Sequence, residues 1–186
     1  HYIKILSYFF IISHFDQKKK FFCNQIKNIN YFLIDIFLKS KLMINPGEYK
    51  LEKSELRRQI IKQRQSLLEA EWKQKSQEIC QNLAKSDLYI KAKTVLGYFS
   101  FRREPDLSYL FLDNKSDNDK NWGFPRCVDK SLIWHYWKSE DELITCKYGI
   151  QEPNPSSPII KPENVDLILV PCVACDYQNY RLGYGG

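Results

Sequence analysis

Apolar positions in the first half of the chain recur at the spacing of an α-helix. From Glu48 on, they fall near multiples of 3.6 residues, at Leu56, Ile60, Leu67, Trp72, Ile79 and Leu83. Ser66 and Glu69 have the form of a capping box, which marks the start of a helix. The pattern therefore predicts two helices that divide near residue 66.

After these helices the pattern changes to that of short strands and turns. Thr94–Phe99 is β-branched and aromatic, and the turn signal Glu104-Pro105 follows it, so we expect a strand there. Leu107–Leu112 indicates a short helix, and Asp113–Asn121 is a polar loop without core residues. The sequence thus predicts a strand, a turn and a helix in succession.

The last third of the chain predicts three more strands. Trp122–Pro125 and Leu132–Trp137 form two of them, and the four prolines of 149–162 indicate an extended connection instead of an element. Asp166–Val170 is a continuous apolar run, which is typical of a strand covered on both faces. Helices followed by alternating strands and helices predict an α/β domain around a largely parallel sheet.

Composition separates the first 42 residues from the rest. The chain has 186 residues, 44% hydrophobic and 27% charged, with a net charge of +6, which suits one globular domain. Residues 1–42 contain 7 Lys, no Arg and 2 Asp, and Ile, Phe, Lys, Asn and Tyr supply 28 of the 42 positions. We interpret 1–42 as an N-terminal extension, not native or disordered, with Met43 as the true start. The domain is then 43–186, and it is nearly neutral.

Several functional classes are disfavoured by the same residues. No apolar run approaches the ~20 residues that span a bilayer, and the basic run Lys18–Lys20 is too short for a nucleic-acid surface. His135 is the only histidine after Met43, which disfavours a hydrolase triad. The cysteines show no disulfide framework, which suits a reducing cytosol, and Cys172 and Cys175 fit best as small residues under a strand.

Three features could bind an anion or a polar substrate. The segment Arg181–Gly186 (RLGYGG) combines an arginine with three glycines, whose backbone amides can close on a phosphate. Lys53 and Arg57 lie on one helical face, and Glu104 lies at the end of a strand. Taken alone, each feature is better explained without a ligand, as a glycine-rich loop, a solvated helix face and a turn carboxylate respectively. Ligands of open α/β sheets bind beyond the carboxyl ends of the strands, here 100–106 and 171–186.

Taken in chain order, these fragments resemble the 5-formyltetrahydrofolate cyclo-ligase family, also called 5,10-methenyltetrahydrofolate synthetase. The resemblance covers about 49–186, and its last block is the most specific. The matching segments are Lys53–Arg57, Tyr98–Ser100 with Glu104, Phe124–Arg126, Gly149–Pro153, Val165–Pro171, Asp176 and Arg181–Gly186.

The resemblance implies a fold and an activity. The fold is a three-layer α/β/α Rossmann-like domain with a largely parallel sheet, related to NagB, RpiA and CoA transferase. The reaction converts 5-formyltetrahydrofolate to 5,10-methenyltetrahydrofolate with ATP and Mg²⁺. ATP phosphorylates the formyl oxygen, and a folate nitrogen closes the ring as phosphate leaves. We expect a cytoplasmic monomer that acts on a small molecule and uses neither nucleic acid nor a membrane.

The resemblance also implies roles for particular residues. Arg181 would act in catalysis, and Phe99, Glu104 and Tyr184 would contact the folate, with Trp134 or Trp137 stacking on its pterin. The residues expected to bind ATP, with Lys53 and Arg57 holding its phosphates from the helix start, are Lys53, Ser54, Glu55, Leu56, Arg57, Arg181, Leu182, Gly183, Tyr184, Gly185 and Gly186.

The sequence departs from the family's pattern in two ways. Cys172 replaces a glycine and Cys175 an aromatic residue in the segment after the buried strand. The chain also ends at Gly186, within the ATP-binding loop, so that we expect a fold incomplete at its C-terminus, with the Mg²⁺-binding aspartate beyond it. The alternative is a non-catalytic phosphate- or cofactor-binding domain of the same fold, in which Cys172 and Cys175 mark lost activity.

Overall fold

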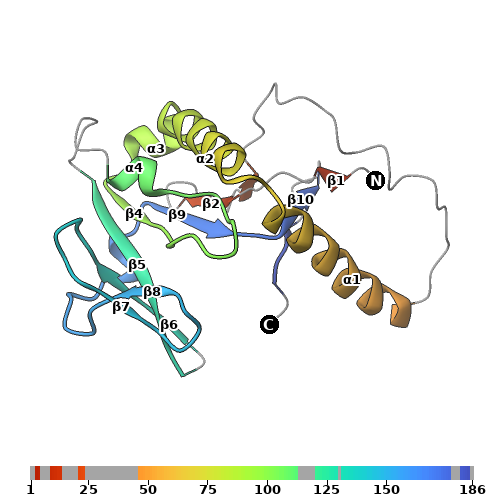
Figure 1. The fold of residues 1–186 in the computed structure, drawn as a ribbon. Helices are drawn as coiled ribbons and strands as arrows, with labels where there is room; N and C mark the ends of the chain where they lie inside the picture. The colour runs from red at the N-terminus through yellow and green to blue at the C-terminus, as the bar shows by residue number, and fades with distance from the viewer. Residues whose placement is uncertain are drawn as a thin grey trace.

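The computed structural model describes residues 3–4, 9–13, 21–23, 46–112, 120–129, 131–176 and 181–184. Figure 1 shows a sheet in the middle of the molecule, helix α2 across one face of it, and helix α1 extending to one side.

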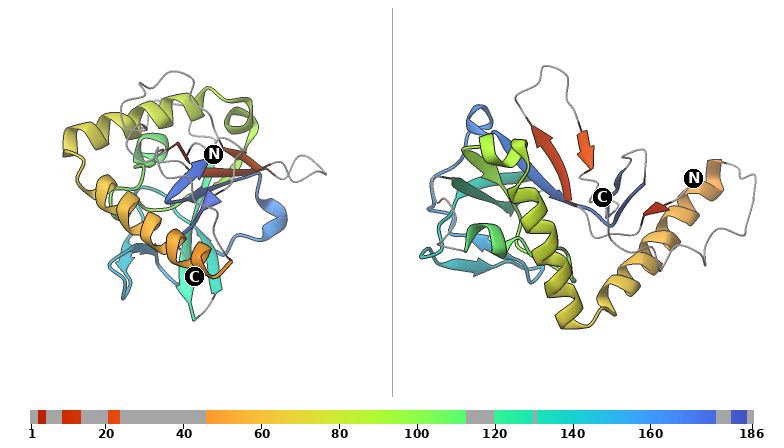
Figure 2. Two further views of the ribbon diagram at one scale, coloured as in Figure 1. Left: turned by 90° about the vertical axis from the view of Figure 1, so that its right-hand side faces the viewer. Right: turned by 90° about the horizontal axis from the view of Figure 1, so that it is seen from above.

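The two predicted helices are present and divide where expected. Helix α1 spans Pro46–Gln65 and α2 spans Glu69–Ala84, and together they form a V in Figure 2. The predicted capping box is wrong, because α2 begins after Leu68 without a side-chain cap. Ser66 instead ends α1, since its Oγ donates to the carbonyl of Gln63 at 2.8 Å. Two short helices follow, α3 (Asp87–Lys91) and α4 (Ser108–Phe111), and α4 confirms the prediction for 107–112.

The main sheet is mixed, with parallel strands at its centre. Its strand order is β3-β2-β9-β4-β5-β6, where β9–β4 and β4–β5 are parallel pairs and the other pairs are antiparallel. The strands are β2 (Phe9–Ser13), β3 (Phe21–Cys23), β4 (Thr94–Leu96), β5 (Asn121–Val128), β6 (Ser131–Tyr136) and β9 (Leu167–Pro171). The predicted α/β class with a largely parallel central sheet is confirmed.

Strand β4 is shorter than predicted and ends at Leu96 instead of Phe99. The amide of Gly97 still donates to the carbonyl of Gly123 at 2.8 Å, after which the chain leaves the sheet as a loop. This early exit places residues 98–106 beyond the carboxyl end of a central parallel strand.

The proline-rich connection contains a hairpin that the sequence did not predict. Strand β7 (Leu143–Thr145) pairs antiparallel with β8 (Gln151–Pro153), so the expectation of no element in 149–162 is wrong. Pro153 is tolerated because it lies at the last position of a short edge strand. A 3₁₀ turn over Pro162–Asn164 then leads to β9.

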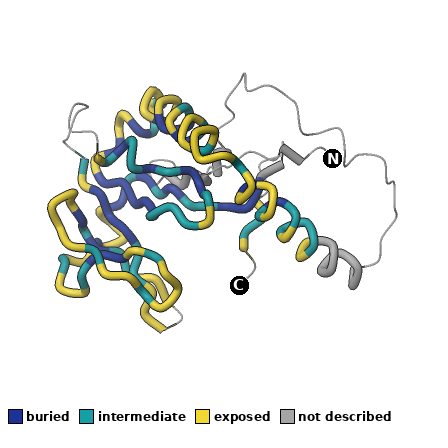
Figure 3. The backbone as a smooth tube through the Cα atoms, viewed as in Figure 1, coloured by how far each residue is buried: buried dark blue, intermediate teal, exposed yellow. Residues whose placement is uncertain are grey.

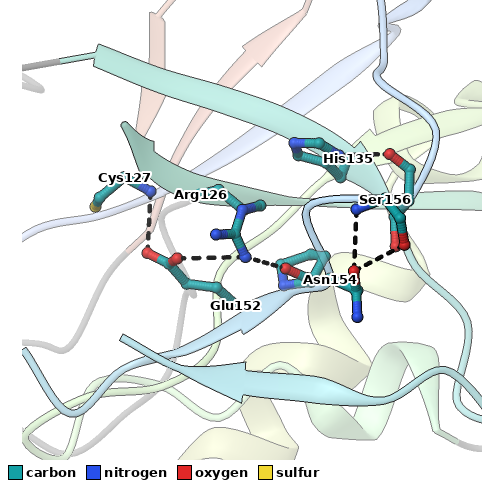
Figure 4. A network of polar contacts seen from close by, with 8 residues as sticks. Arg126, Cys127, His135, Glu152, Asn154 and Ser156 are labelled. Atoms are coloured by element: carbon teal, nitrogen blue, oxygen red, sulfur yellow. Dashed lines mark hydrogen bonds and ion pairs between the residues drawn. The ribbon is translucent and has the colours of Figure 1, made fainter. Parts of the chain in front are cut away.

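A polar network fixes the β7–β8 hairpin to strand β5 (Figure 4). Glu152 is buried, and its Oε1 accepts from the amide of Cys127 at 2.9 Å. Arg126 donates to the carbonyl of Pro153, and its Nη1 lies 3.7 Å from the Glu152 carboxylate. Two of the segments that carry the family resemblance are thus joined by one ion pair, whose carboxylate is buried.

The core lies between the sheet and helices α2–α4, where Figure 3 shows the longest buried stretches. Its centre is aromatic: Phe124 is fully buried and contacts Phe99, Phe111, Trp122 and Trp137 at centroid distances of 4.1 to 6.1 Å. Aromatic rings of this kind supply most of the area buried in a small core.

The segment before Met43 contributes three short strands. β2 pairs antiparallel with β9, and β1 (Ile3–Lys4) joins β10 (Ala174–Asp176) and β11 (Arg181–Leu182) in a small second sheet. The domain boundary at Met43 stays a prediction, and the predicted polar loop lies outside the described residues from 113 to 119. In the described part of the chain, no helix is long and apolar enough to cross a membrane.

Candidate active site

Three segments far apart in the sequence meet beyond strand β4. They are helix α1, the loop that follows β4, and the segment 181–184. Arg57 on α1 donates from Nε to the carbonyl of Gly183 at 2.7 Å, and Leu56 packs with Leu182 around the buried Ile60. The structure thus brings together two parts of the predicted ATP-binding set that are 126 residues apart.

The position of Lys53–Arg57 in the helix differs from the prediction. Because α1 begins at Pro46, these residues lie about two turns inside the helix. Their side chains, and not the free amides of a helix start, are therefore the groups that could contact phosphate.

A carboxylate and a phenol form the centre of the site. Glu104 is 4% exposed, and its Oε1 accepts a hydrogen bond from the Tyr184 hydroxyl. Its Oε2 accepts from the amide of Phe101 at 3.0 Å. The Glu104 carbonyl accepts from Trp72 Nε1 at 2.7 Å and from Ser100 Oγ at 2.8 Å. Both the backbone and the carboxylate of Glu104 are therefore held in place.

Arg64 completes this centre, and the sequence analysis missed it. It is 5% exposed and donates to three oxygens: the carbonyl of Arg102 at 3.1 Å, the carbonyl of Cys172 at 3.3 Å, and Tyr184 Oη at 2.5 Å. Its guanidinium also lies 5.7 Å from the centroid of the Tyr184 ring. A signal was present, because Arg57 and Arg64 are seven residues apart and so share one face of a helix.

Burial changes the acidity of both partners. Loss of solvent raises the pKa of Glu104 above its ordinary value, and hydrogen bonds from Tyr184 and Phe101 and the charge of Arg64 oppose this rise. Burial, followed by the hydrogen bond to Glu104, raises the pKa of Tyr184 to about 12. The phenol therefore keeps its proton at neutral pH and can donate it to the carboxylate.

The loop that carries Glu104 contains a strained turn. Arg102 and Arg103 have φ angles of 51° and 59°, in the left-handed region that side chains other than glycine rarely adopt. Strain of this kind, ~1–3 kcal/mol per residue, persists only where surrounding contacts hold it. Here Arg64 bonds to the Arg102 carbonyl, and the Arg103 guanidinium lies 5.1 Å from the Trp72 ring centroid.

The aromatic residues predicted to meet the folate lie close to one another. Phe99 is half-buried and stacks on Phe124 with a centroid distance of 4.1 Å, and Trp137 meets it edge-on at 5.4 Å. Trp137 is buried in the core, whereas Trp134 packs in another cluster, against Leu96. Stacking of either tryptophan on a pterin stays a prediction.

Other predicted residues lie at the surface or outside the description. Lys53, Ser54 and Arg181 are exposed, and Glu55 forms an ion pair with Arg58 on the same helix. Gly185 and Gly186 lie outside the described residues. Cys172 is fully buried, in agreement with its interpretation as a small packed residue, while the side chain of Cys175 is not described.

Tyr98 gives a first testable prediction, on stability. Among the described residues, its buried hydroxyl has no hydrogen-bond partner. An unpaired buried hydroxyl costs ~1–3 kcal/mol. Tyr98→Phe is therefore expected to raise the free energy of unfolding by about 1 kcal/mol in urea titrations, whereas Tyr148→Phe, at an exposed position, changes it little. A loss of stability in Tyr98→Phe would show that the hydroxyl is satisfied after all.

A hollow lies apart from the Glu104–Tyr184 centre. Its volume is about 730 Å³, and residues at the start of β5 and the end of β6, including Lys120, Asn121 and Trp137, line it. Of the residues expected to meet the folate, Trp137 lines this hollow, whereas Phe99, Glu104 and Tyr184 do not. No group of three or more metal-ligating side chains occurs within the described ranges.

The fold and the site together define a class of protein. An α/β domain that gathers a buried carboxylate, a phenol and two guanidinium groups beyond a central parallel strand has the construction of an enzyme for a small polar substrate. A sequence profile of the 5-formyltetrahydrofolate cyclo-ligase family matches residues 49–186. The chain therefore belongs to the 5-formyltetrahydrofolate cyclo-ligase family and is an enzyme of this ligase class.

Solved structures agree with this assignment. The NMR structure of 5,10-methenyltetrahydrofolate synthetase from Aquifex aeolicus is 33% identical, with a TM-score of 0.64, over 72% of this chain and 68% of that one. A 5,10-methenyltetrahydrofolate synthetase from Mycoplasma pneumoniae has 23% identity and a TM-score of 0.56, over 72% of each chain, and supports the fold. No curated protein sequence matches the chain.

Proposed function

We propose that this protein converts 5-formyltetrahydrofolate to 5,10-methenyltetrahydrofolate and releases ADP and phosphate from ATP. The observation that carries the proposal is the hydrogen bond between Tyr184 and Glu104. It joins the segment expected to bind phosphate to the carboxylate expected to bind folate. The family and the 33% identical synthetase structure support the same activity.

The proposed chemistry proceeds in two steps. The formyl oxygen attacks the γ-phosphorus of ATP, the bond from that phosphorus to the bridging oxygen breaks, and ADP leaves. The second folate nitrogen then attacks the activated carbon, and inorganic phosphate leaves as the ring closes and that nitrogen loses its proton. Negative charge moves through the transferred phosphoryl group, so fixed positive groups around it lower the barrier.

The described residues can supply these groups. Lys53, Arg57 and Arg181 would contact phosphate oxygens, since guanidinium and ammonium groups form charge-assisted hydrogen bonds to them. Arg181 would neutralise charge on the phosphoryl group as it moves. Phe99 would pack against the flat pterin, and Glu104 with Tyr184 would hold its polar edge or the formyl group.

Mg²⁺ belongs to the proposal as the ion that accompanies ATP. In nucleotide sites it is bound largely by phosphate oxygens and water, with one or two protein carboxylates.

We also propose that the enzyme acts on this small molecule as a monomer in the cytoplasm, without nucleic acid or membrane partners. The thiols of Cys80, Cys127 and Cys146 are free, which suits a reducing compartment.

The test follows product formation directly. The full-length protein is mixed with 5-formyltetrahydrofolate, ATP and Mg²⁺, and the absorbance of methenyltetrahydrofolate is recorded, with ADP measured in parallel. Product and ADP are expected in equal amounts, and none when ATP is omitted. ATP binding without product formation would instead support the non-catalytic phosphate-binding alternative.

Arg181→Ala tests the phosphate-binding role. A charge-assisted hydrogen bond contributes ~1.5–3 kcal/mol, so its loss is expected to raise the KM for ATP roughly 10- to 150-fold. The KM for 5-formyltetrahydrofolate should change much less. Lys161→Ala, at an exposed position in another part of the surface, is the control. An unchanged KM for ATP in Arg181→Ala would refute the role given to Arg181.

A further inference from the structure

Arg64 is the most deeply buried cation near the site, and none of the expected functions uses it. It is 5% exposed on a helix whose neighbouring lysine, Lys62, is exposed to solvent. A buried guanidinium is costly unless its donors are paired, and here three oxygens from three different segments accept from it. These contacts join helix α1, the loop after β4 and the segment 181–184.

The chemistry of the groups fixes the direction of the hydrogen bonds. A guanidinium has donors and no acceptor, so the bond between Arg64 and Tyr184 Oη uses a lone pair of the phenol. The phenol proton is then free to point toward Glu104 Oε1, which lies within hydrogen-bond distance of the hydroxyl. Without Arg64, the same hydroxyl could rotate and offer its proton elsewhere.

The second oxygen of Glu104 is also fixed by Arg64, through the backbone. Glu104 Oε2 accepts from the amide of Phe101, within the loop that contains the left-handed residues Arg102 and Arg103. The bond from Arg64 Nε to the Arg102 carbonyl holds this strained turn. Both oxygens of the carboxylate therefore depend on one guanidinium.

We propose that Arg64 is a positioning residue: it orients the Tyr184 hydroxyl and the 101–104 turn so that Glu104 presents its remaining lone pairs to the substrate in one fixed direction. This inference rests on the proposed function for the identity of the substrate. The orientation of Glu104 and Tyr184 in the free protein does not depend on that identity, so the two can be tested separately.

The first test is a double-mutant cycle that measures the dissociation constant of 5-formyltetrahydrofolate. Arg64→Met is expected to raise it roughly 10- to 100-fold, and Tyr184→Phe to raise it by a similar factor. Because Arg64 acts through the hydroxyl, Arg64→Met should cost much less when Tyr184 is already phenylalanine. Additive effects would overturn the proposal. Lys62→Met, two residues away on the exposed face, should bind as the unaltered protein does.

The second test needs no substrate and follows the titration of Glu104 by ¹³C NMR, with its signal identified from Glu104→Gln. The positive charge of Arg64 lowers the pKa of Glu104, so Arg64→Met should move the titration to higher pH. Arg64→Lys keeps the charge but cannot reach all three acceptors, so it should restore the titration and not the affinity. A titration that is unmoved in Arg64→Met overturns the proposal.

The two tests also separate the inference from the proposed function. If the unaltered protein does not bind 5-formyltetrahydrofolate, the proposed function fails, and the NMR titration still decides whether Arg64 controls Glu104. If the protein binds the folate but the cycle is additive, the inference alone fails. Should Arg64→Met not fold, Arg64→Lys replaces it in the binding cycle, and an unchanged dissociation constant in Arg64→Lys would overturn the proposal.

Discussion

Glu104→Gln is expected to lower kcat/KM for 5-formyltetrahydrofolate by roughly 10²- to 10³-fold. The carboxylate has two oxygens and receives two donors, the Tyr184 hydroxyl and the Phe101 amide. An amide has one oxygen, so one of these donors must face an NH₂ group that also donates. The substrate loses a charged acceptor at the same time. The measurement is steady-state kinetics with saturating ATP.

The control for this prediction is another glutamate. Glu163 lies exposed in the 3₁₀ turn before β9, so Glu163→Gln should leave kcat/KM unchanged. The KM for ATP should also be nearly unaltered in Glu104→Gln, because the phosphate-binding groups are on other segments. A loss of less than about fivefold would mean that Glu104 does not contact the substrate.

The affinity for the folate should also depend on pH through the ionisation of Glu104. Burial raises the pKa of Glu104, and the site needs the anionic form to accept from Tyr184. Affinity for the folate should therefore fall as pH decreases through a value above the ordinary 4.5 of a glutamate. In Glu104→Gln this acid-side decrease is expected to disappear.

Much of the fold could be predicted because short sequence patterns indicate its helices and strands. The helical period gave α1 and α2, and the apolar run at 166–170 gave β9, shifted by one residue. The β7–β8 hairpin was missed because its three-residue strands are too short to show a period and its last residue is a proline. The capping box failed because Ser66 could bond backward to Gln63 as easily as forward.

The site could be predicted only in part, for a physical reason. The sequence shows the separate parts of the site, which are Lys53–Arg57, Glu104 and 181–184. Their proximity in space depends on hydrogen bonds between residues that lie 80 to 126 positions apart in the chain. Arg64 shares a helix face with Arg57, but this spacing alone does not separate it from a solvated cation on a basic helix. What distinguishes it is burial, which arises only when the 101–104 turn and Tyr184 close over it.

The aromatic core positions Phe99, which we expect to contact the folate. Phe99 leaves the sheet just after β4, and its ring stacks on Phe124 at 4.1 Å with an interplanar angle of 14°. Phe124 itself is fully buried between Trp122, Phe111 and Trp137. A fully buried residue thus determines where the ring of Phe99 lies.

Phe124→Ala is accordingly expected to lower the free energy of unfolding by about 3 to 5 kcal/mol, a large fraction of the ~5–15 kcal/mol of a typical domain. Phe124→Leu keeps most of the side-chain volume, so its free energy of unfolding should fall less and the protein should remain folded. Its KM for 5-formyltetrahydrofolate should nevertheless rise, because Phe99 loses its stacking partner. Urea titrations and kinetics measure the two effects. Leu132→Ala, 56% exposed on the adjacent strand β6, is the control. If Phe124→Leu loses stability without any rise in that KM, Phe99 does not form a wall of the folate site.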